Sequence, residues 1–143
     1  MTSVLHKEYK VIRDDYARAG KVSSDIKKTL STIGIDTAVL RRIAVASYEA
    51  EINMIIHAWG GDVSMDVFDD GSIKLVFKDP GPGITDMEKA MTPGFSTAND
   101  EARNLGFGAG MGLPNIKRVS DSFEIETSEK GTTLTLGFSV MQP

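Results

Sequence analysis

Two polar side chains stand out in a segment that is otherwise rich in apolar residues. Glu49 and Asn53 are four residues apart in SYEAEINMII, so a helix would place them on one face, and Arg42 falls on the same stripe. A carboxylate on a largely apolar helix is costly unless it is paired or used, which makes Glu49 a candidate base and Asn53 a candidate ligand. The spacing equally fits an ordinary polar pair on a helix surface. We expect Glu51 to face elsewhere and to be solvated, and it serves as a control.

A second group of residues follows an expected strand, SIKLVF, in the stretch KDPGPGI at residues 78–84. A simple turn needs one glycine, or one proline beside one glycine, whereas this stretch places Gly81 and Gly83 directly after the carboxylate of Asp79. Asp79 at a strand exit could accept a hydrogen bond from an exocyclic amine, such as N6 of adenine. The same residues also fit a tight turn in which Asp79 caps its own backbone.

A third feature is a ladder of alternate glycines that opens an expected helix. It consists of Gly106, Gly108, Gly110 and Gly112, with Met111 just before the last glycine. Alternate glycines let a backbone approach a ligand closely, and a helix N-terminus adds a positive dipole end, so together they can cradle phosphate. A glycine-rich surface loop is the alternative. The pattern is neither a P-loop, because no Lys-Ser or Lys-Thr closes it, nor a Rossmann fingerprint, because no strand leads directly into it.

Composition limits the classes of protein that these residues can belong to. The chain has 143 residues, 41% of them hydrophobic and 25% charged, which fits one globular domain over residues 1–143. A net charge of −4 gives no general attraction to nucleic acid. With no cysteine, disulfides and thiolate metal sites are excluded. No apolar stretch approaches the roughly 20 residues of a membrane helix, and the N-terminus lacks the apolar core of a signal peptide. We therefore expect a cytoplasmic protein without nucleic-acid or membrane partners.

The elements that must position these residues can be read from periodicity. We expect a strand in 6–15, a helix in 22–35 with Ser23 or Ser24 as N-cap and Gly34 as C-cap, and a long, buried helix in 36–59 capped by Asp36 or Thr37. Two hairpins follow at 62–79 and 122–140, with turns at 69–71 and 129–131. Between them lie a short helix at 86–91, a loop at 92–110 and a helix at 111–121. Adjacent hairpins predict an α+β fold with a largely antiparallel sheet and helices on one face.

The order of these motifs resembles the Bergerat nucleotide-binding fold. That fold belongs to the ATPase and kinase superfamily of DNA gyrase, the ninety-kilodalton heat-shock chaperone, histidine kinases and MutL. The matching stretches are EAEIN, DPGPG, GFGAGMG and GTT at 131–133. More narrowly, SYEAEINMIIHA, GFST and GMGLPNIKRVSD are similar to the small bacterial serine/threonine kinases of the anti-sigma factor and stress-response switch group. The resemblance implies a two-layer sandwich with a mixed, mostly antiparallel sheet.

The resemblance also implies that the chain binds ATP and Mg²⁺. Asp79 would bind the adenine amino group, and Thr133 or its neighbour Thr132 would touch the base. Asn53 would hold Mg²⁺, and Glu49 would orient or deprotonate the attacking hydroxyl. The glycines implied to line the nucleotide site are Gly81, Gly83, Gly106, Gly108, Gly110 and Gly112, together with Met111.

One position departs from the pattern. Some anti-sigma kinases carry an arginine close before the last glycines, where this chain has glycine or alanine. Arg103 lies further upstream and is our candidate for a cation that reaches the γ-phosphate. The alternative is a solvated loop residue.

The resemblance implies an ATP-dependent serine/threonine protein kinase. Its substrate would be a serine on an anti-sigma-factor antagonist, and a sigma factor or a phosphatase could use the same surface as a further partner. Two alternatives stay open. One is an ATP-gated protein-binding module without phosphotransfer, and the other is a free-standing histidine kinase catalytic domain, which needs a phosphoacceptor helix from another chain. Whether the protein is a monomer or a homodimer also stays open.

Overall fold

Five strands form one antiparallel sheet. The computed structural model describes residues 2–56, 58–81, 91 and 112–139. Its described elements are β1 (Ser3–Val11), the 3₁₀ turn η1 (Tyr16–Arg18), α1 (Lys21–Thr32), α2 (Thr37–Ile56), β2 (Gly61–Phe68), β3 (Ile73–Asp79), α5 (Gly112–Val119), β4 (Ser122–Ser128) and β5 (Gly131–Phe138). The strand order is β1-β2-β3-β5-β4.

Every strand pairing that the structure describes is antiparallel, although we expected a mixed sheet. Two successive helices between β1 and β2 return the chain antiparallel to its starting direction. The crossover after β3 then places β5 beside it, with β4 on the outer edge. The α+β class is confirmed.

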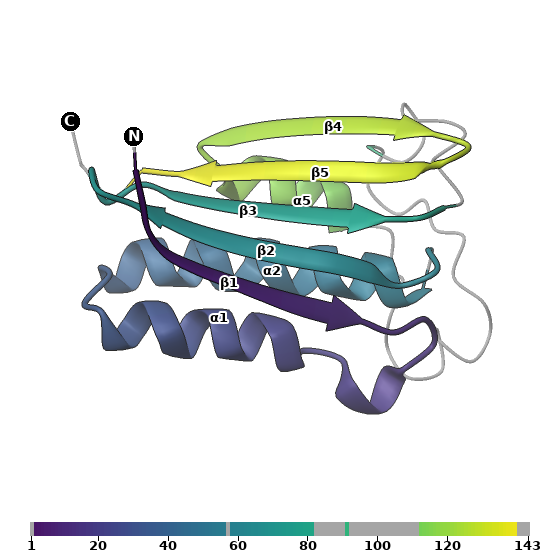
Figure 1. Cartoon of the computed structure of the whole chain (residues 1–143), viewed down its shortest axis with the longest axis horizontal. Coiled ribbons are helices and arrows are strands. Elements are labelled where there is room, and N and C mark those ends of the chain that lie inside the picture. Colours follow the sequence, from purple (N-terminus) through teal and green to yellow (C-terminus); the bar gives the residue numbers. More distant parts are fainter. Residues whose placement is uncertain (1, 57, 82–90, 92–111, 140–143) are drawn as a thin grey trace.

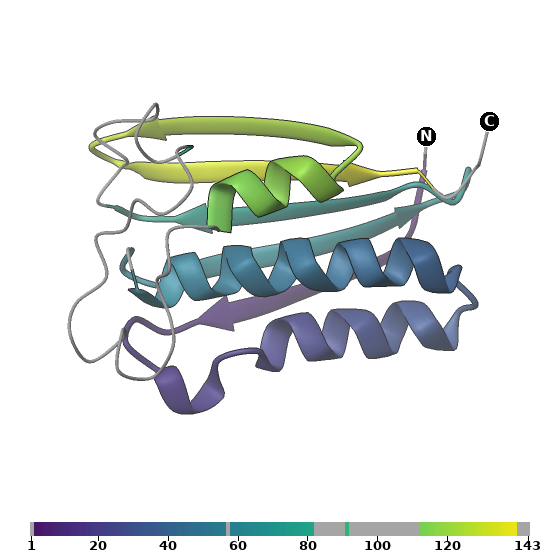
Figure 2. The ribbon, with the colours of Figure 1, turned by 180° about the vertical axis from the view of Figure 1, so that it is seen from behind.

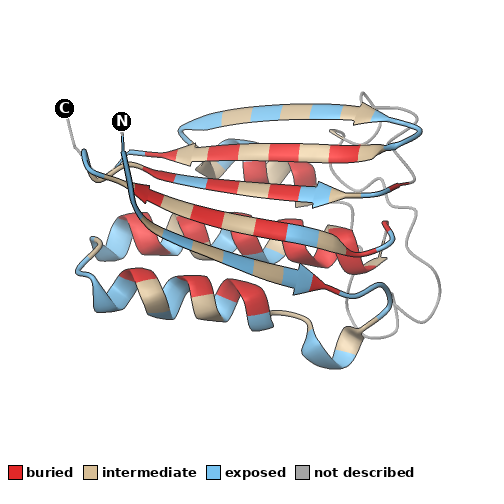
Figure 3. Ribbon diagram, in the orientation of Figure 1, coloured by how far each residue is buried: buried red, intermediate tan, exposed pale blue. Residues whose placement is uncertain are grey.

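The molecule has two layers, with all three described α-helices on one face of the sheet (Figure 1). Seen from behind, α2 lies between α1 and α5 (Figure 2). Along each strand, more buried residues alternate with less buried ones, as a sheet with one covered face requires (Figure 3). Val63, Met65 and Val67 face the helices as the alternation predicted, and the expected hairpin turns after Phe68 and Ser128 are present. This core holds the strand ends in place.

The start of α1 differs from the prediction. Its N-cap is Gly20, with a φ of 92°, and not Ser23 or Ser24, which lie within the helix. The hydroxyl of Ser23 donates back to the carbonyl of Gly20 at 3.1 Å. Since glycine has no side chain to accept hydrogen bonds, the first N–H groups of α1 need an acceptor from elsewhere in the fold.

That acceptor is Glu51, which we expected to be solvated. It is only 2% exposed, and its carboxylate accepts hydrogen bonds from the backbone N–H groups of Gly20, Val22 and Ser23 at 3.0–3.2 Å. A carboxylate at a helix N-terminus also interacts favourably with the helix dipole. Glu51 therefore caps α1 from the neighbouring helix α2, and the prediction of a solvated side chain was wrong.

The other helix ends follow the sequence more closely. After α1, the N–H groups of Gly34 and Ile35 donate to the carbonyls of Ser31 and Leu30, both at 3.1 Å, which is the Schellman pattern at a helix end. Gly34 has a φ of 90° there. Asp36 caps α2 by accepting the N–H of Ala38 at 3.0 Å.

Two further predictions concern α2 and the segment after β3. We expected α2 to be a buried helix, but Val45 and Tyr48 are 41% and 38% exposed. The short helix at 86–91 and the loop at 92–110 lie outside the described residues, apart from Met91. No helix in the described part of the chain is long and apolar enough to cross a membrane.

Candidate nucleotide site

The chemistry-bearing residues gather at one end of the molecule. The ends of α2 and β3, the start of α5 and the turn between β4 and β5 all lie toward the right of Figure 1. This arrangement follows from the topology, because β3 and β5 are antiparallel neighbours and the chain leaves β3 where it enters β5. Residues that are far apart in the sequence, such as Asp79 and Thr132, therefore become direct partners.

Asp79 is the last residue of β3, and its two carboxylate oxygens differ in their surroundings. Oδ1 accepts the backbone N–H of Gly81 at 3.0 Å and that of Thr132 at 3.2 Å. No residue in the described segments donates to Oδ2. One oxygen therefore fixes the orientation of the carboxylate, while the other is available to a donor from a ligand.

The environment of Asp79 opposes its charge. Burial raises the pKa of this carboxyl group above 3.8, and the N–H groups of Gly81 and Thr132 counteract only part of that effect. A carboxylate that is held by two backbone donors yet disfavoured by burial gains from any further donor. An amine that binds to Oδ2 would supply one.

The structure separates the two threonines that we considered for the base. Thr132 pairs with Asp79 in the sheet and lies on the same covered face as Leu134. Its hydroxyl is 2.8 Å from that of Thr127 on β4. Thr133 pairs with Lys78 and faces the other side of the sheet. Only Thr132 is brought together with Asp79.

Two neighbouring turns hold the backbone that follows β3. Gly131 has a φ of 128°, and a Cβ at this position would overlap the carbonyl of Asp79. Gly61 has a φ of 143°, and a Cβ there would overlap the carbonyl of Lys78. Both close approaches require glycine, so the exit of β3 is clamped between the β4–β5 turn and the start of β2.

Asn53 and the start of α5 are also in contact. A Cβ at Gly112, the last glycine of the ladder and the first residue of α5, would lie 3.0 Å from both Oδ1 and Nδ2 of Asn53. The amide of Asn53 makes no hydrogen bond with the described residues. The absence of a side chain at Gly112 therefore leaves space that no described residue occupies beside a carboxamide oxygen, the kind of hard oxygen ligand that Mg²⁺ prefers. Asn53 thus fits a bound Mg²⁺.

Glu49 lies one helical turn before Asn53 on α2. It is partly buried, and burial raises the pKa of its carboxyl group above 4.5. Within the described residues it has no hydrogen-bonding or ion-pair partner. A partly desolvated carboxylate without a partner is more basic than a solvated one. Arg42 does not approach it, because its guanidinium binds Asp121 at 3.0 Å near the other end of α5.

Several predicted site residues lie outside the described part of the chain. They are Gly83, Gly106, Gly108, Gly110, Met111 and Arg103. Their assignment to the site stays a prediction.

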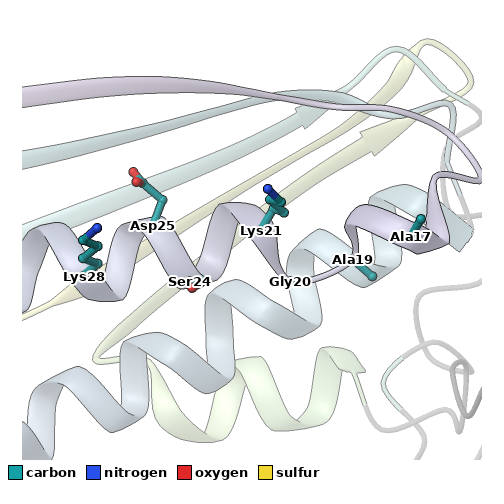
Figure 4. A pocket seen from close by; sticks show the side chains of 7 residues that line it. All are labelled: Ala17, Ala19, Gly20, Lys21, Ser24, Asp25 and Lys28. Carbon is teal, nitrogen blue, oxygen red and sulfur yellow. The ribbon is translucent and has the colours of Figure 1, made fainter.

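A surface depression of about 560 Å³ lies elsewhere, beside η1 and the start of α1 (Figure 4). Its lining residues are Ala17, Ala19, Gly20, Lys21, Ser24, Asp25 and Lys28. None of the predicted site residues lines it. The N–H groups that begin α1 are already used by Glu51, so this helix start has little to offer an anion.

Sequence reasoning missed the roles of two residues. Glu51 was expected to be solvated but caps α1, and Trp59 received no role although it adjoins the exit of β3. The pair of glycines that follows Trp59, at residues 60 and 61, was a signal that this turn approaches other backbone closely.

The fold is that of a histidine kinase-like ATPase domain. The chain belongs to the family of histidine kinase-like ATPase domains, whose model matches residues 12–138. It is 33% identical over 116 residues to the serine/threonine-protein kinase RsbT of Bacillus subtilis, covering 79% of each chain. It is also 31% identical over 144 residues to the anti-sigma F factor of Bacillus velezensis, covering 95% of this chain and 92% of that one.

Solved structures confirm the fold. The RsbU and RsbW domains of Rv1364c from Mycobacterium tuberculosis match with a TM-score of 0.61 at 19% identity, covering 92% of this chain and 32% of that one. The SiaB-SiaC complex from Pseudomonas aeruginosa matches with a TM-score of 0.59 at 11% identity, covering 95% of this chain and 89% of that one. At these identities the matches speak for the fold alone.

Proposed function

We propose that this chain is an ATP-dependent serine/threonine protein kinase that acts in partner switching. Its substrate is a serine on an anti-sigma-factor antagonist. The observation that carries the proposal is Asp79, whose Oδ1 is fixed by two backbone donors while Oδ2 receives no donor from the described residues. The names of the relatives support the reaction, since one is a serine/threonine-protein kinase and others are anti-sigma F factors.

The base of the nucleotide binds at the exit of β3. Oδ2 of Asp79 accepts a hydrogen bond from the adenine amine, and Thr132 lies beside Asp79 on the covered face of the sheet. The predicted ladder of glycines then leads the phosphates toward the start of α5, where Gly112 lies against Asn53. Bound Mg²⁺ supplies charge neutralisation to the phosphates, and Asn53 is the residue of this chain that would hold it.

Glu49 acts on the attacking serine. It orients the hydroxyl and accepts its proton while the serine oxygen forms a bond to the γ-phosphorus. The bond between that phosphorus and the bridging oxygen breaks, and ADP leaves with the electron pair. The raised pKa of Glu49 favours this role, because a more basic carboxylate is a stronger proton acceptor.

The test combines binding and transfer. Calorimetry with ATP and Mg²⁺ measures binding, and mass spectrometry of candidate antagonist proteins after incubation measures phosphoserine. The proposal expects saturable ATP binding and one phosphoserine per antagonist. ATP binding that alters the affinity for the antagonist without any phosphoserine would identify an ATP-gated binding module instead. Absence of ATP binding would overturn both functions.

A further inference from the structure

Trp59 is a large aromatic residue that is exposed to solvent and has no part in the proposed mechanism. It follows α2, is the chain's only tryptophan, and is 53% exposed. The preceding residue, Ala58, is buried, so the chain reaches the surface at Trp59. An exposed indole gives up much of the hydrophobic stabilisation that burial would provide.

The turn that carries Trp59 is held tightly against the end of β3. Gly60 has a φ of 72°, and a Cβ there would overlap the carbonyl of Val11 at the end of β1. A Cβ at Gly61 would overlap the carbonyl of Lys78 and lie 2.9 Å from Cα of Asp79. The two glycines therefore fix the position of Trp59 relative to Asp79 through backbone contact.

Trp59 then makes two contacts with the residue that binds Asp79. Its backbone N–H donates to the carbonyl of Gly81 at 3.0 Å. A Cβ placed on Gly81 would lie 3.5 Å from Cζ3 of the indole, so the ring packs directly against this glycine, which is buried. Gly81 in turn donates its N–H to Oδ1 of Asp79. The indole therefore supports one of the two donors that orient the carboxylate.

We infer that Trp59 is a positioning residue for base recognition, which holds the turn from Asp79 to Gly81 so that Oδ2 of Asp79 meets the base amine. This inference rests on the proposed function. It predicts a specific defect when the ring is removed. The backbone of Gly81 gains freedom, Asp79 loses its fixed orientation, and the hydrogen bond to the adenine amine weakens, while contacts to the phosphates are unaffected.

The test is nucleotide selectivity. Inosine triphosphate carries the same ribose and phosphates as ATP, but an oxygen replaces the amine, so it measures binding without the bond to Asp79. We expect Trp59→Ala to weaken ATP binding roughly tenfold and to change the affinity for inosine triphosphate by less than about threefold. Trp59→Phe, which keeps an aromatic ring against Gly81, should restore most of the selectivity.

Ile12 offers a matched control. It is also a large, exposed apolar residue, at 57%, and it sits beside the Val11 carbonyl that Gly60 approaches. Ile12→Ala should leave both affinities unchanged. Circular dichroism and thermal unfolding establish that each variant is folded. In wild type, tryptophan emission provides a second measurement, because a change that saturates with ATP reports directly on Trp59.

The outcomes separate the inference from the proposed function. If wild type binds ATP and Asp79→Asn weakens it, but Trp59→Ala keeps the selectivity for ATP over inosine triphosphate, the inference is wrong and the function stands. Equal weakening of both nucleotides by Trp59→Ala would reduce the residue to a general structural role and overturn the inference. If wild type binds no ATP, both the function and the inference fail.

Discussion

Replacement of Asp79 by asparagine isolates the oxygen that faces the ligand. The amide oxygen of asparagine can take the place of Oδ1 and still accept the N–H groups of Gly81 and Thr132. The amide NH₂ then occupies the place of Oδ2. This NH₂ group and the adenine amine are both hydrogen-bond donors, so they cannot bond to each other. The variant should therefore fold normally but bind ATP poorly.

The magnitude follows from the bond that is lost. A hydrogen bond to a charged group contributes about 1.5–3 kcal/mol, which corresponds to a roughly tenfold to hundredfold weaker Kd. The fold should not suffer, because burial raises the pKa of Asp79. The folded state then holds a proton that the unfolded state releases, so this group's contribution to stability is present below the unfolded pKa and is lost as pH rises through the folded pKa. Asparagine does not ionise, and the Tm of Asp79→Asn relative to wild type should rise from pH 3 toward pH 7.

The assay is calorimetry of wild type and Asp79→Asn with ATP and with inosine triphosphate. Wild type should prefer ATP to inosine triphosphate. The variant should lose this preference or reverse it, because its amide NH₂ can donate to the oxygen that replaces the amine in inosine triphosphate. Unchanged ATP affinity in the folded variant would refute the assignment of Asp79 to the base. So would wild-type protein that binds inosine triphosphate as tightly as ATP.

Further predictions concern three substitutions in α2. Asn53→Ala should abolish the gain in ATP affinity that Mg²⁺ provides, and an equal gain in wild type and variant, measured with and without a chelator, would exclude Asn53 as a ligand. Glu49→Gln should change ATP affinity by less than about threefold but slow phosphoserine formation by roughly 10²–10⁴. Because the pKa of Glu49 is raised, Glu49→Gln should also gain stability relative to wild type as pH rises above 4.5. Glu51→Gln places an amide donor against the N–H groups that begin α1, so it should lower the free energy of unfolding by roughly 1–3 kcal/mol, as measured by urea denaturation. The control Glu124→Gln, on the exposed face of β4, should leave that free energy almost unchanged.

The sheet could be predicted from the sequence because its signals are local. Alternation at Val63, Met65 and Val67 identifies both the strand and its covered face. The same rule could have chosen between the two threonines, because Leu134 is buried and Thr132 shares its face. Asp79 was found because a carboxylate between a strand and two glycines is unusual for a simple turn.

Glu51 could not be placed from the sequence, because its role depends on a contact between two helices. Glu49 and Glu51 are about 200° apart around α2, so they face different neighbours. Which of them meets the start of α1 depends on how the two helices pack, and nothing near Glu51 in the sequence indicates it. The sequence also did not identify Gly20 as the N-cap of α1. Because glycine has no side chain, the first N–H groups of this helix need an acceptor that is distant in the sequence, which is Glu51.

The proposed kinase activity is tested by phosphate transfer in a mixture that contains the protein, ATP with Mg²⁺, and the antagonist. Wild type and Glu49→Gln are each saturated with γ-labelled ATP and Mg²⁺ and mixed with an anti-sigma-factor antagonist that calorimetry has shown to bind. Rapid quenching then measures label on serine over time. We expect one labelled serine and one ADP per antagonist in wild type, and a rate roughly 10²–10⁴-fold lower in the variant. Wild-type protein that holds ATP and the antagonist together yet transfers no label, or a variant that transfers as fast as wild type, would contradict this expectation.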